Sequence, residues 1–145
     1  MGGADSPLGT VELVATSLYV ADLDRAIAWY GDKLGLQPMV VGADGDRYAS
    51  YSIAGALIVL EPREAALDPG EPGAETSTVN LVVNRDPAEA RNDLMRRGVS
   101  CSDVVESPNF VSFLIRDLDG NRFYVTRAVS QQARDAVREV SESAT

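Results

Sequence analysis

The sequence contains no histidine. The side chains that could take part in chemistry are therefore carboxylates, hydroxyls, amides, guanidinium groups and aromatic rings. Without imidazole, an iron, zinc or nickel site of the usual histidine-ligated kind cannot form. The 22 acidic residues leave an all-carboxylate site open. Cys101 is the single cysteine, which excludes an internal disulfide. With no histidine to activate its thiol, we expect Cys101 to be inert rather than a nucleophile.

Two predicted β-hairpins carry many of the hydroxyl and aromatic side chains. The first joins residues 47–53 to residues 56–61, and the second joins residues 110–116 to residues 122–127. Neighbouring residues of a strand point to opposite sides, so one face of each hairpin is apolar and the other is mixed. We expect the mixed faces to line a cleft, with the side chains of Tyr48, Ser50, Ser52, Phe110, Ser112, Leu114 and Arg116.

The hairpins belong to a weak internal duplication. In one segment Val20 and Gly35 lie 15 positions apart, and in a second Val83 and Gly98 lie 15 positions apart. In each copy a strand precedes a helix, and short apolar runs at 39–41 and 99–105 supply one more strand to each. The sequence therefore predicts an α+β fold of two βαβββ modules, and such a fold places its working site between the copies.

Both helices of the duplication carry start and stop signals. Asp22 is placed to cap the first helix, whereas Asp86, Pro87 and Glu89 predict an N-cap with a capping box for the second. Gly35 and Gly98 are the last residues of the two segments, and glycine at such a position is typical of a helix that ends in a left-handed conformation.

Length and composition favour one compact unit, because 145 residues with 45% hydrophobic content can bury one core. The expected organisation is a single domain at 1–127 followed by an extension at 128–145. Within the domain we expect module one at about 12–61, a connector or lid at 62–77 and module two at about 78–127.

The extension is expected to form an amphipathic helix. Val129, Ala133, Ala136 and Val140 recur at helical spacing, and we expect the helix to fray from residue 141 onward. Two placements stay open: docking on its own domain, or packing across the homodimer that we expect this chain to form.

Net charge and hydropathy exclude two kinds of partner. The formal charge of −9 and the pI of about 4.4 argue against nucleic acid, which requires clustered lysine and arginine. No apolar run approaches the roughly 20 residues of a membrane span, and the N-terminus lacks the features of a signal peptide. We therefore expect no membrane partner and a cytoplasmic location.

Two stretches of the sequence resemble a known family. Val20-Ala-Asp-Leu-Asp-Arg-Ala-Ile-Ala-Trp-Tyr-Gly-Asp-Lys-Leu-Gly-Leu36 and Arg116-Asp-Leu-Asp-Gly-Asn121 are similar to the vicinal oxygen chelate superfamily, the glyoxalase, bleomycin-resistance and extradiol dioxygenase group. The resemblance covers residues 12 to 127 and implies paired βαβββ modules whose sheets curl around a cleft. It says less about function, since folds of this kind host many chemistries.

The resemblance also points to four metal-ligand positions. Metal-dependent members place His, Gln or Glu at positions that correspond here to Ala15, Val59, Thr78 and Tyr124. None of these is a usual ligand of a catalytic divalent ion. We therefore expect no metal and no other cofactor, which argues against glyoxalase and dioxygenase activity.

If those four positions face the cleft, strand alternation identifies the other lining residues. The candidate ligand-binding residues are Ser17, Tyr19, Tyr48, Ser50, Val59, Glu61, Thr78, Asn80, Phe110, Ser112, Arg122 and Tyr124; Ala15, Leu57, Val82 and Thr126 share the same faces. The aromatic rings could stack a flat ligand, while the amide and hydroxyls orient it through hydrogen bonds.

Two hypotheses about function follow. The first is a metal-independent protein that holds or sequesters an aromatic or amphipathic small molecule, similar to the bleomycin-resistance branch of the family. The alternative is a metal-independent isomerase, cyclase or lyase with Glu61 as base and Tyr19, Tyr124 or Arg122 stabilising negative charge. A structural or regulatory dimer without a ligand remains open as well.

Overall fold

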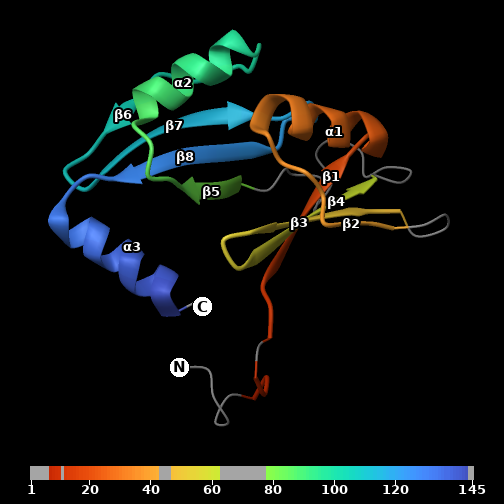
Figure 1. Ribbon diagram of the computed structural model, residues 1–145, viewed down its shortest axis with the longest axis horizontal. Coiled ribbons are helices and arrows are strands. Elements are labelled where there is room, and N and C mark those ends of the chain that lie inside the picture. The colour runs from red at the N-terminus through yellow and green to blue at the C-terminus, as the bar shows by residue number, and fades with distance from the viewer. Residues whose placement is uncertain (1–6, 11, 43–46, 63–77, 144–145) are drawn as a thin grey trace.

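The duplication is visible as two four-stranded mixed sheets with the same strand order (Figure 1). The computed structural model describes residues 7–10, 12–42, 47–62 and 78–143. The first module contains β1 (Ala15–Val20), α1 (Leu23–Trp29), η1 (Tyr30–Leu34), β2 (Val40–Val41), β3 (Ala49–Ile53) and β4 (Ala56–Pro62). The second contains β5 (Thr78–Val82), α2 (Pro87–Arg96), β6 (Val105–Glu106), β7 (Phe110–Arg116) and β8 (Arg122–Ala128), and α3 (Gln131–Ser143) follows it.

Each sheet has one parallel pair and two antiparallel pairs. The orders are β1-β4-β3-β2 and β5-β8-β7-β6, with β1 parallel to β4 and β5 parallel to β8. Helices α1 and α2 lie on one side of the sheets (Figure 1). The predicted α+β class, the two βαβββ modules and the C-terminal helix are thus confirmed, while the expected connector at 62–77 falls almost entirely outside the described residues.

The first helix starts as predicted, and the second starts differently. The Asp22 carboxylate accepts a hydrogen bond from the Arg25 backbone N–H at 3.1 Å, which satisfies one free donor of α1. The predicted capping box of α2 is wrong: Asp86 occupies the N-cap position without a side-chain cap bond. Pro87 stands at the first helical position, where its missing N–H leaves no donor to satisfy.

The strand predicted at 99–105 is much shorter in the structure. Only Val105–Glu106 forms β6, and Cys101 makes an isolated bridge to Ile115. The cause is Ser102, whose backbone N–H donates to the Leu114 carbonyl while its Oγ accepts from the Leu114 N–H at 2.7 Å. A side-chain oxygen takes the place of the next backbone acceptor, and this local bond competes with a regular ladder.

One hydrophobic core fills the space between the helices and both sheets. Tyr30, at the end of α1, is 2% exposed, and its ring lies 5.6 Å from Tyr51 of the first sheet and 6.0 Å from Phe123 of the second. Leu18 and Phe113 are also fully buried in this cluster. The first helix therefore packs on both modules, and burial of these side chains couples the two sheets.

A buried polar network joins the β7–β8 turn to the first module. The Asp117 carboxylate accepts from the Tyr30 hydroxyl at 2.6 Å, from the Asn121 N–H and side-chain amide at 2.9 and 3.0 Å, and from the Asp119 N–H at 2.9 Å. The Asn121 amide also donates to the Tyr19 carbonyl, and Asp119 accepts from the Ala21 N–H. We call Asp117, Asp119 and Asn121 the turn latch. The Asp-x-Asp-Gly-Asn motif thus connects the modules through charge-assisted hydrogen bonds.

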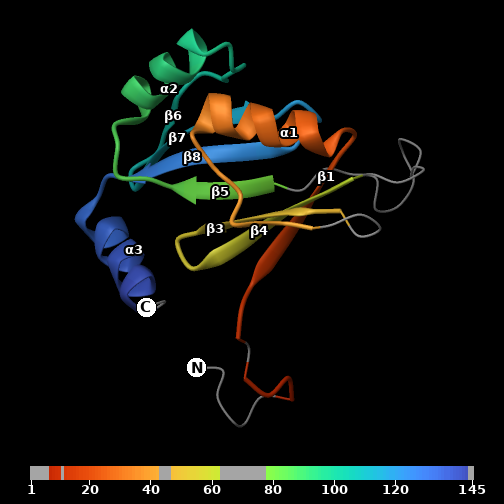
Figure 2. The same cartoon turned by 45° about the vertical axis from the view of Figure 1, so that its right-hand side comes forward.

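The C-terminal helix lies on the opposite side of the second sheet from α2 (Figure 2). Ser130 caps it, since its Oγ accepts from the Ala133 N–H at 3.0 Å and donates to the Asn109 side chain at 2.8 Å. The predicted inward face was wrong in part, because Ala133 is buried and Val137 is half-buried, whereas Ala136 and Val140 are exposed. The expected fraying is also wrong, since α3 continues to Ser143. In the described part of the chain, no helix has the length and apolarity needed to cross a membrane.

Candidate functional site

The second sheet presents an ordered set of side chains on its cleft face, the face turned away from α1 and α2. Strand register aligns these residues in rows across β5, β8 and β7. The three rows are Thr78, Arg122 and Arg116 (the cationic row), Asn80, Tyr124 and Leu114 (the aromatic row), and Val82, Thr126 and Ser112 (the hydroxyl row). Neighbouring rows are two residues apart, which is about 7 Å along the strands.

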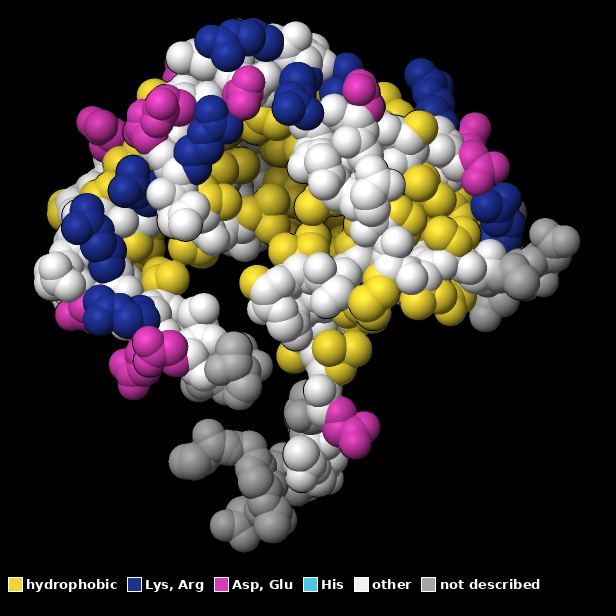
Figure 3. Space-filling model, in the orientation of Figure 1, with side chains coloured by type: hydrophobic (Ala, Val, Ile, Leu, Met, Phe, Trp, Pro, Cys, Tyr) yellow, Lys and Arg dark blue, Asp and Glu magenta, His cyan; other side chains and the backbone are white. Residues whose placement is uncertain are grey.

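A cavity of about 460 Å³ lies over the aromatic and hydroxyl rows. Its lining residues are Asn80, Val82, Phe110, Ser112, Tyr124, Thr126 and Val137. The space-filling view shows a hollow between α3 and the rest of the molecule, with hydrophobic side chains along its upper wall (Figure 3). The structure therefore brings together four of the predicted binding residues, namely Asn80, Phe110, Ser112 and Tyr124.

Polar groups in this cavity are only partly satisfied by the protein. The Thr126 hydroxyl donates to Asn80 Oδ1 at 2.7 Å, which fixes the amide and leaves its nitrogen as a donor toward the cavity. Among the described residues, the Ser112 and Tyr124 hydroxyls have no hydrogen-bond partner. Tyr124 and Phe110 are 41% and 40% exposed, so both rings offer apolar surface beside these donors. Such a mixture suits a small organic molecule with a few polar atoms.

Val137 is the cavity residue that sequence reasoning missed. It projects from α3 and lies one helical turn after Ala133, the residue that anchors this helix. The available signal was the spacing of four residues between Ala133 and Val137, but Ala136 and Val140 fit the apolar period as well. Only the position of α3 against β8 decides which of them faces the cavity.

The remaining predicted binding residues do not line this cavity. Arg122 and Thr78 stand in the adjacent cationic row. The other six belong to the first module: Ser17, Tyr19, Ser50, Val59 and Glu61 share the cleft face of the first sheet, and Tyr48 directly precedes β3. The candidates thus form two groups, because α3 packs against β8 of the second sheet, and its Val137 completes the lining of the cavity there.

Glu61, the candidate base, lies next to Tyr19 in the register of β1 and β4. Within the described ranges its carboxylate makes no hydrogen bond or ion pair. A general base needs the proton donor and its own orienting partner within hydrogen-bond reach. No described side chain orients the Glu61 carboxylate, and the enzyme hypothesis stays a prediction from the sequence.

The four positions that carry metal ligands in metal-dependent relatives do not fit a metal here. Ala15 and Val59 are on the cleft face of the first sheet and offer no donor atom, while Thr78 and Tyr124 on the second sheet offer only neutral hydroxyls. Across the described ranges, no group of three or more His, Cys, Asp or Glu residues is placed to hold a metal ion. Catalytic divalent ions require imidazole or carboxylate ligands, which these four positions lack.

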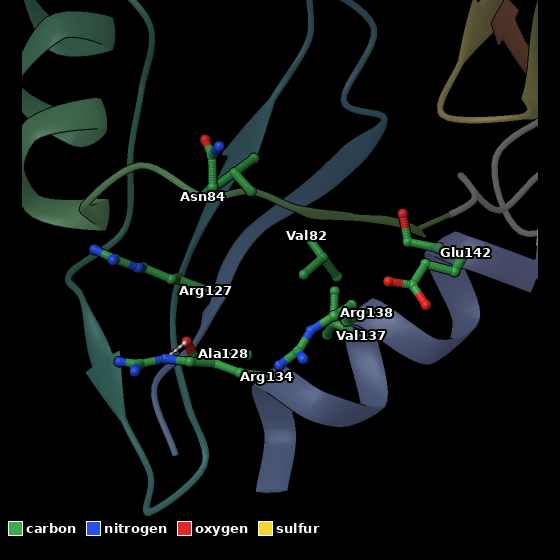
Figure 4. A pocket seen from close by; sticks show the side chains of 10 residues that line it. Val82, Asn84, Arg127, Ala128, Arg134, Val137, Arg138 and Glu142 are labelled. Atoms are coloured by element: carbon green, nitrogen blue, oxygen red, sulfur yellow. Dashed lines mark hydrogen bonds between the residues drawn. The ribbon is translucent and has the colours of Figure 1, made fainter. Parts of the chain in front are cut away.

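A second cavity of about 480 Å³ shares Val82 and Val137 with the first as lining residues. Figure 4 shows these two valines pointing toward each other, with Arg127 extending away from them. Arg134 Nε donates to the Ala128 carbonyl at 3.4 Å, and Arg138 pairs with Asp135 at 2.7 Å on the same helix. This cavity is a gap beside α3, and Val137 separates it from the cavity over the aromatic row.

Comparison with known proteins identifies a family and solved structures with a similar fold. Residues 12–125 match the family model for the Glyoxalase/Bleomycin resistance protein/Dioxygenase superfamily. No curated protein matches the sequence. Among solved structures, TioX from Micromonospora sp. ML1 is similar with a TM-score of 0.65 and 19% identity, covering 81% of this chain and 98% of TioX.

Two further solved structures show the same fold. TnmS3, an antibiotic binding protein from Streptomyces sp. CB03234, has a TM-score of 0.65 and 19% identity, with 82% of this chain and 97% of TnmS3 covered. A superfamily member from Sphaerobacter thermophilus DSM 20745 has a TM-score of 0.65 and 22% identity, with 81% and 97% covered. Since the family model spans most of the sequence, the chain belongs to the glyoxalase, bleomycin resistance protein and dioxygenase superfamily.

Proposed function

We propose that this chain is a metal-independent binding protein that holds an aromatic or amphipathic small molecule over the aromatic row. The observation that carries the proposal is the cavity of about 460 Å³ in which the Tyr124 and Phe110 rings flank unpaired polar groups of Asn80 and Ser112. A flat ligand could stack on the rings while the amide and hydroxyl fix its orientation.

The metal-ligand positions support a role without metal chemistry. Ala15, Val59, Thr78 and Tyr124 provide neither imidazole nor carboxylate, so the donor set of a catalytic divalent ion is missing at the positions where the family carries it. The fold is shared with TnmS3, which is an antibiotic binding protein, and this likeness is compatible with a binding role. The volume of about 460 Å³ and the mixed polar and apolar lining of the cavity suit a small organic ligand.

The test is a binding screen with a matched pair of variants. Native mass spectrometry and thermal shift would be measured against planar aromatic antibiotics and natural products, and the affinity of any hit would be determined by isothermal titration calorimetry. Tyr124→Ala should weaken binding by about tenfold or more, because it removes a stacking surface and its apolar contacts. Tyr19→Ala is the control, since Tyr19 is 43% exposed, close to the 41% of Tyr124, but lies outside this cavity.

The control decides between a site at this cavity and a nonspecific apolar surface. Equal losses of affinity in both variants would contradict the assignment of the ligand to the aromatic row. Failure of every flat ligand to bind would contradict the binding function itself.

A further inference from the structure

The cationic row stands next to the cavity and carries two arginines without acidic partners. Arg116 on β7 and Arg122 on β8 are register partners on the cleft face, and Thr78 on β5 completes the row. Within the part of the chain that the structure describes, neither arginine side chain makes a hydrogen bond or ion pair. Arg122 Nε is shielded from solvent and has no partner there.

This arrangement is unfavourable for the protein alone. Like charges directly opposite each other on neighbouring strands repel, and a buried donor without an acceptor lowers stability. Several other arginines of this acidic chain have partners, since Arg85 pairs with Asp93, Arg91 donates to the Ser102 carbonyl and Arg97 donates to the Asp32 carbonyl. Arg116 and Arg122 differ from these in standing directly opposite each other, and an anion placed between the two guanidinium groups would offset their repulsion and accept from the buried Arg122 donor.

The acidic groups around this end of the sheet are engaged elsewhere or do not reach the arginines. Asp117 accepts four hydrogen bonds in the turn latch, and Asp119 accepts from the Ala21 N–H. Glu61 lies on the cleft face of the first sheet and forms no ion pair with a described residue. The positive charge of the row is not neutralised by these carboxylates.

Its position beside the aromatic row assigns a chemical class to the ligand. Resting on the function proposed above, we infer that the ligand is an aromatic anion whose ring lies on Tyr124 and whose carboxylate or similar oxygen-bearing group is bound by Arg116 and Arg122. The rows are about 7 Å apart along the strands, so a ring placed on Tyr124 and an anionic group attached directly to that ring can reach both rows. Guanidinium groups bind such oxygens through paired, charge-assisted hydrogen bonds, and the Thr78 hydroxyl adds a further donor.

The order of the cationic and aromatic rows along the strands defines the orientation of the ligand. At the end away from the arginines, the cavity is closed by Val82 of β5 and Val137 of α3. The anionic end of the ligand therefore points toward the β7–β8 turn, and its apolar end points toward α3.

The test compares naphthalene-2-carboxylate with naphthalene-2-carboxamide, which share a ring system and differ in charge. Isothermal titration calorimetry near neutral pH should show the carboxylate binding about tenfold tighter or more. Arg116→Gln and Arg122→Gln should each remove most of this preference and leave the carboxamide affinity unchanged. Arg127→Gln is the matched control, because Arg127 is also half-buried and unpaired among the described residues but lies on the opposite face of β8.

The possible outcomes separate this inference from the proposed function. If the carboxamide binds as tightly as the carboxylate, or if Arg127→Gln removes the preference as fully as the other variants, the anion site is refuted while aromatic binding stands. If neither probe binds the wild-type protein, aromatic binding at the cavity fails as well. Should Arg122→Gln not fold, the exposed Arg116 carries the same test, since its replacement removes no buried contact.

Discussion

Removing the hydroxyl of Tyr30 should weaken the connection between the two modules. Tyr30→Phe keeps the buried ring but deletes its 2.6 Å hydrogen bond to Asp117. Tyr51→Phe is the matched control: Tyr51 is 1% exposed, its ring lies 5.6 Å from that of Tyr30, and its hydroxyl is buried without a partner among the described residues. The two variants make the same chemical change in one core, one with a hydrogen bond and one without.

The two substitutions are expected to change the free energy of unfolding in different ways: Tyr30→Phe should lower it, whereas Tyr51→Phe should leave it unchanged or raise it. A hydrogen bond to a charged group contributes about 1.5 to 3 kcal/mol, and Asp117 keeps three N–H donors after the change, so we expect Tyr30→Phe to destabilise by about 1.5 to 2 kcal/mol. At this chain length that corresponds to a fall in Tm of about 3 to 8 °C. Tyr51→Phe removes an unpaired buried hydroxyl and should be neutral or stabilise by about 1 kcal/mol.

Urea unfolding followed by far-ultraviolet circular dichroism measures both values. Trp29, the only tryptophan, gives a second signal from the same core because its ring lies 5.4 Å from that of Tyr30. Equal destabilisation by the two variants would show that loss of a buried hydroxyl, and not loss of the bond to Asp117, is being measured. A change of less than about 0.5 kcal/mol in Tyr30→Phe would refute the contribution of the bond to Asp117.

Three other predictions concern the core and one turn. Burial, followed by the charge of Asp117, raises the pKa of Tyr30, and burial raises the pKa of Tyr51. Because the unfolded chain loses these protons near pH 10 and the folded chain holds them to higher pH, the free energy of unfolding should fall above about pH 10, by up to about 1.4 kcal/mol per pH unit for each residue, and tyrosinate absorbance should show two of the five tyrosines ionising at higher pH in the folded protein than in urea. Ala54 has a φ of 51° in the β3–β4 turn, so Ala54→Gly should raise the free energy of unfolding by about 1 kcal/mol in urea titrations, and no gain would show that the turn is unstrained. Burial raises the pKa of the Cys101 thiol, so Cys101 should react with iodoacetamide much more slowly in the folded protein than in urea, and equal rates would contradict its inertness.

The repeat predicted the architecture because local chemistry and long-range packing agree in both copies. Alternation in β7 and β8 matched their bounds closely, and Asp22 capped α1 as its position indicated. Two of the failures arose where a tertiary contact decided the outcome. Ser102 replaced a strand bond at 99–105, and the docking of α3 selected Val137 over Ala136. Neither contact leaves a periodic pattern in the sequence.

The sequence predicted which side of the sheet each candidate residue faces, but not which of these residues share one cavity. Alternation identified Asn80, Phe110, Ser112 and Tyr124, all of which line one cavity. It assigned the residues of the first sheet to the same site, because parity indicates which side a residue faces and carries no information on which elements close a cavity over it. The unpaired state of Arg116 and Arg122 was also invisible, since a sequence of 22 acids suggests partners for every arginine.

The turn latch makes the two halves of the duplication structurally unequal. In the second half the β7–β8 connection is long enough to carry Asp117, Asp119 and Asn121, whereas the first half closes the equivalent β3–β4 hairpin with Ala54 and Gly55 alone. A dimer of two first halves would therefore have no side chains with which to fasten its turns to its partner. The symmetry of the two modules is broken at this point, and each half depends on the other: the first supplies the tyrosine hydroxyl, and the second supplies the carboxylate that accepts its hydrogen bond.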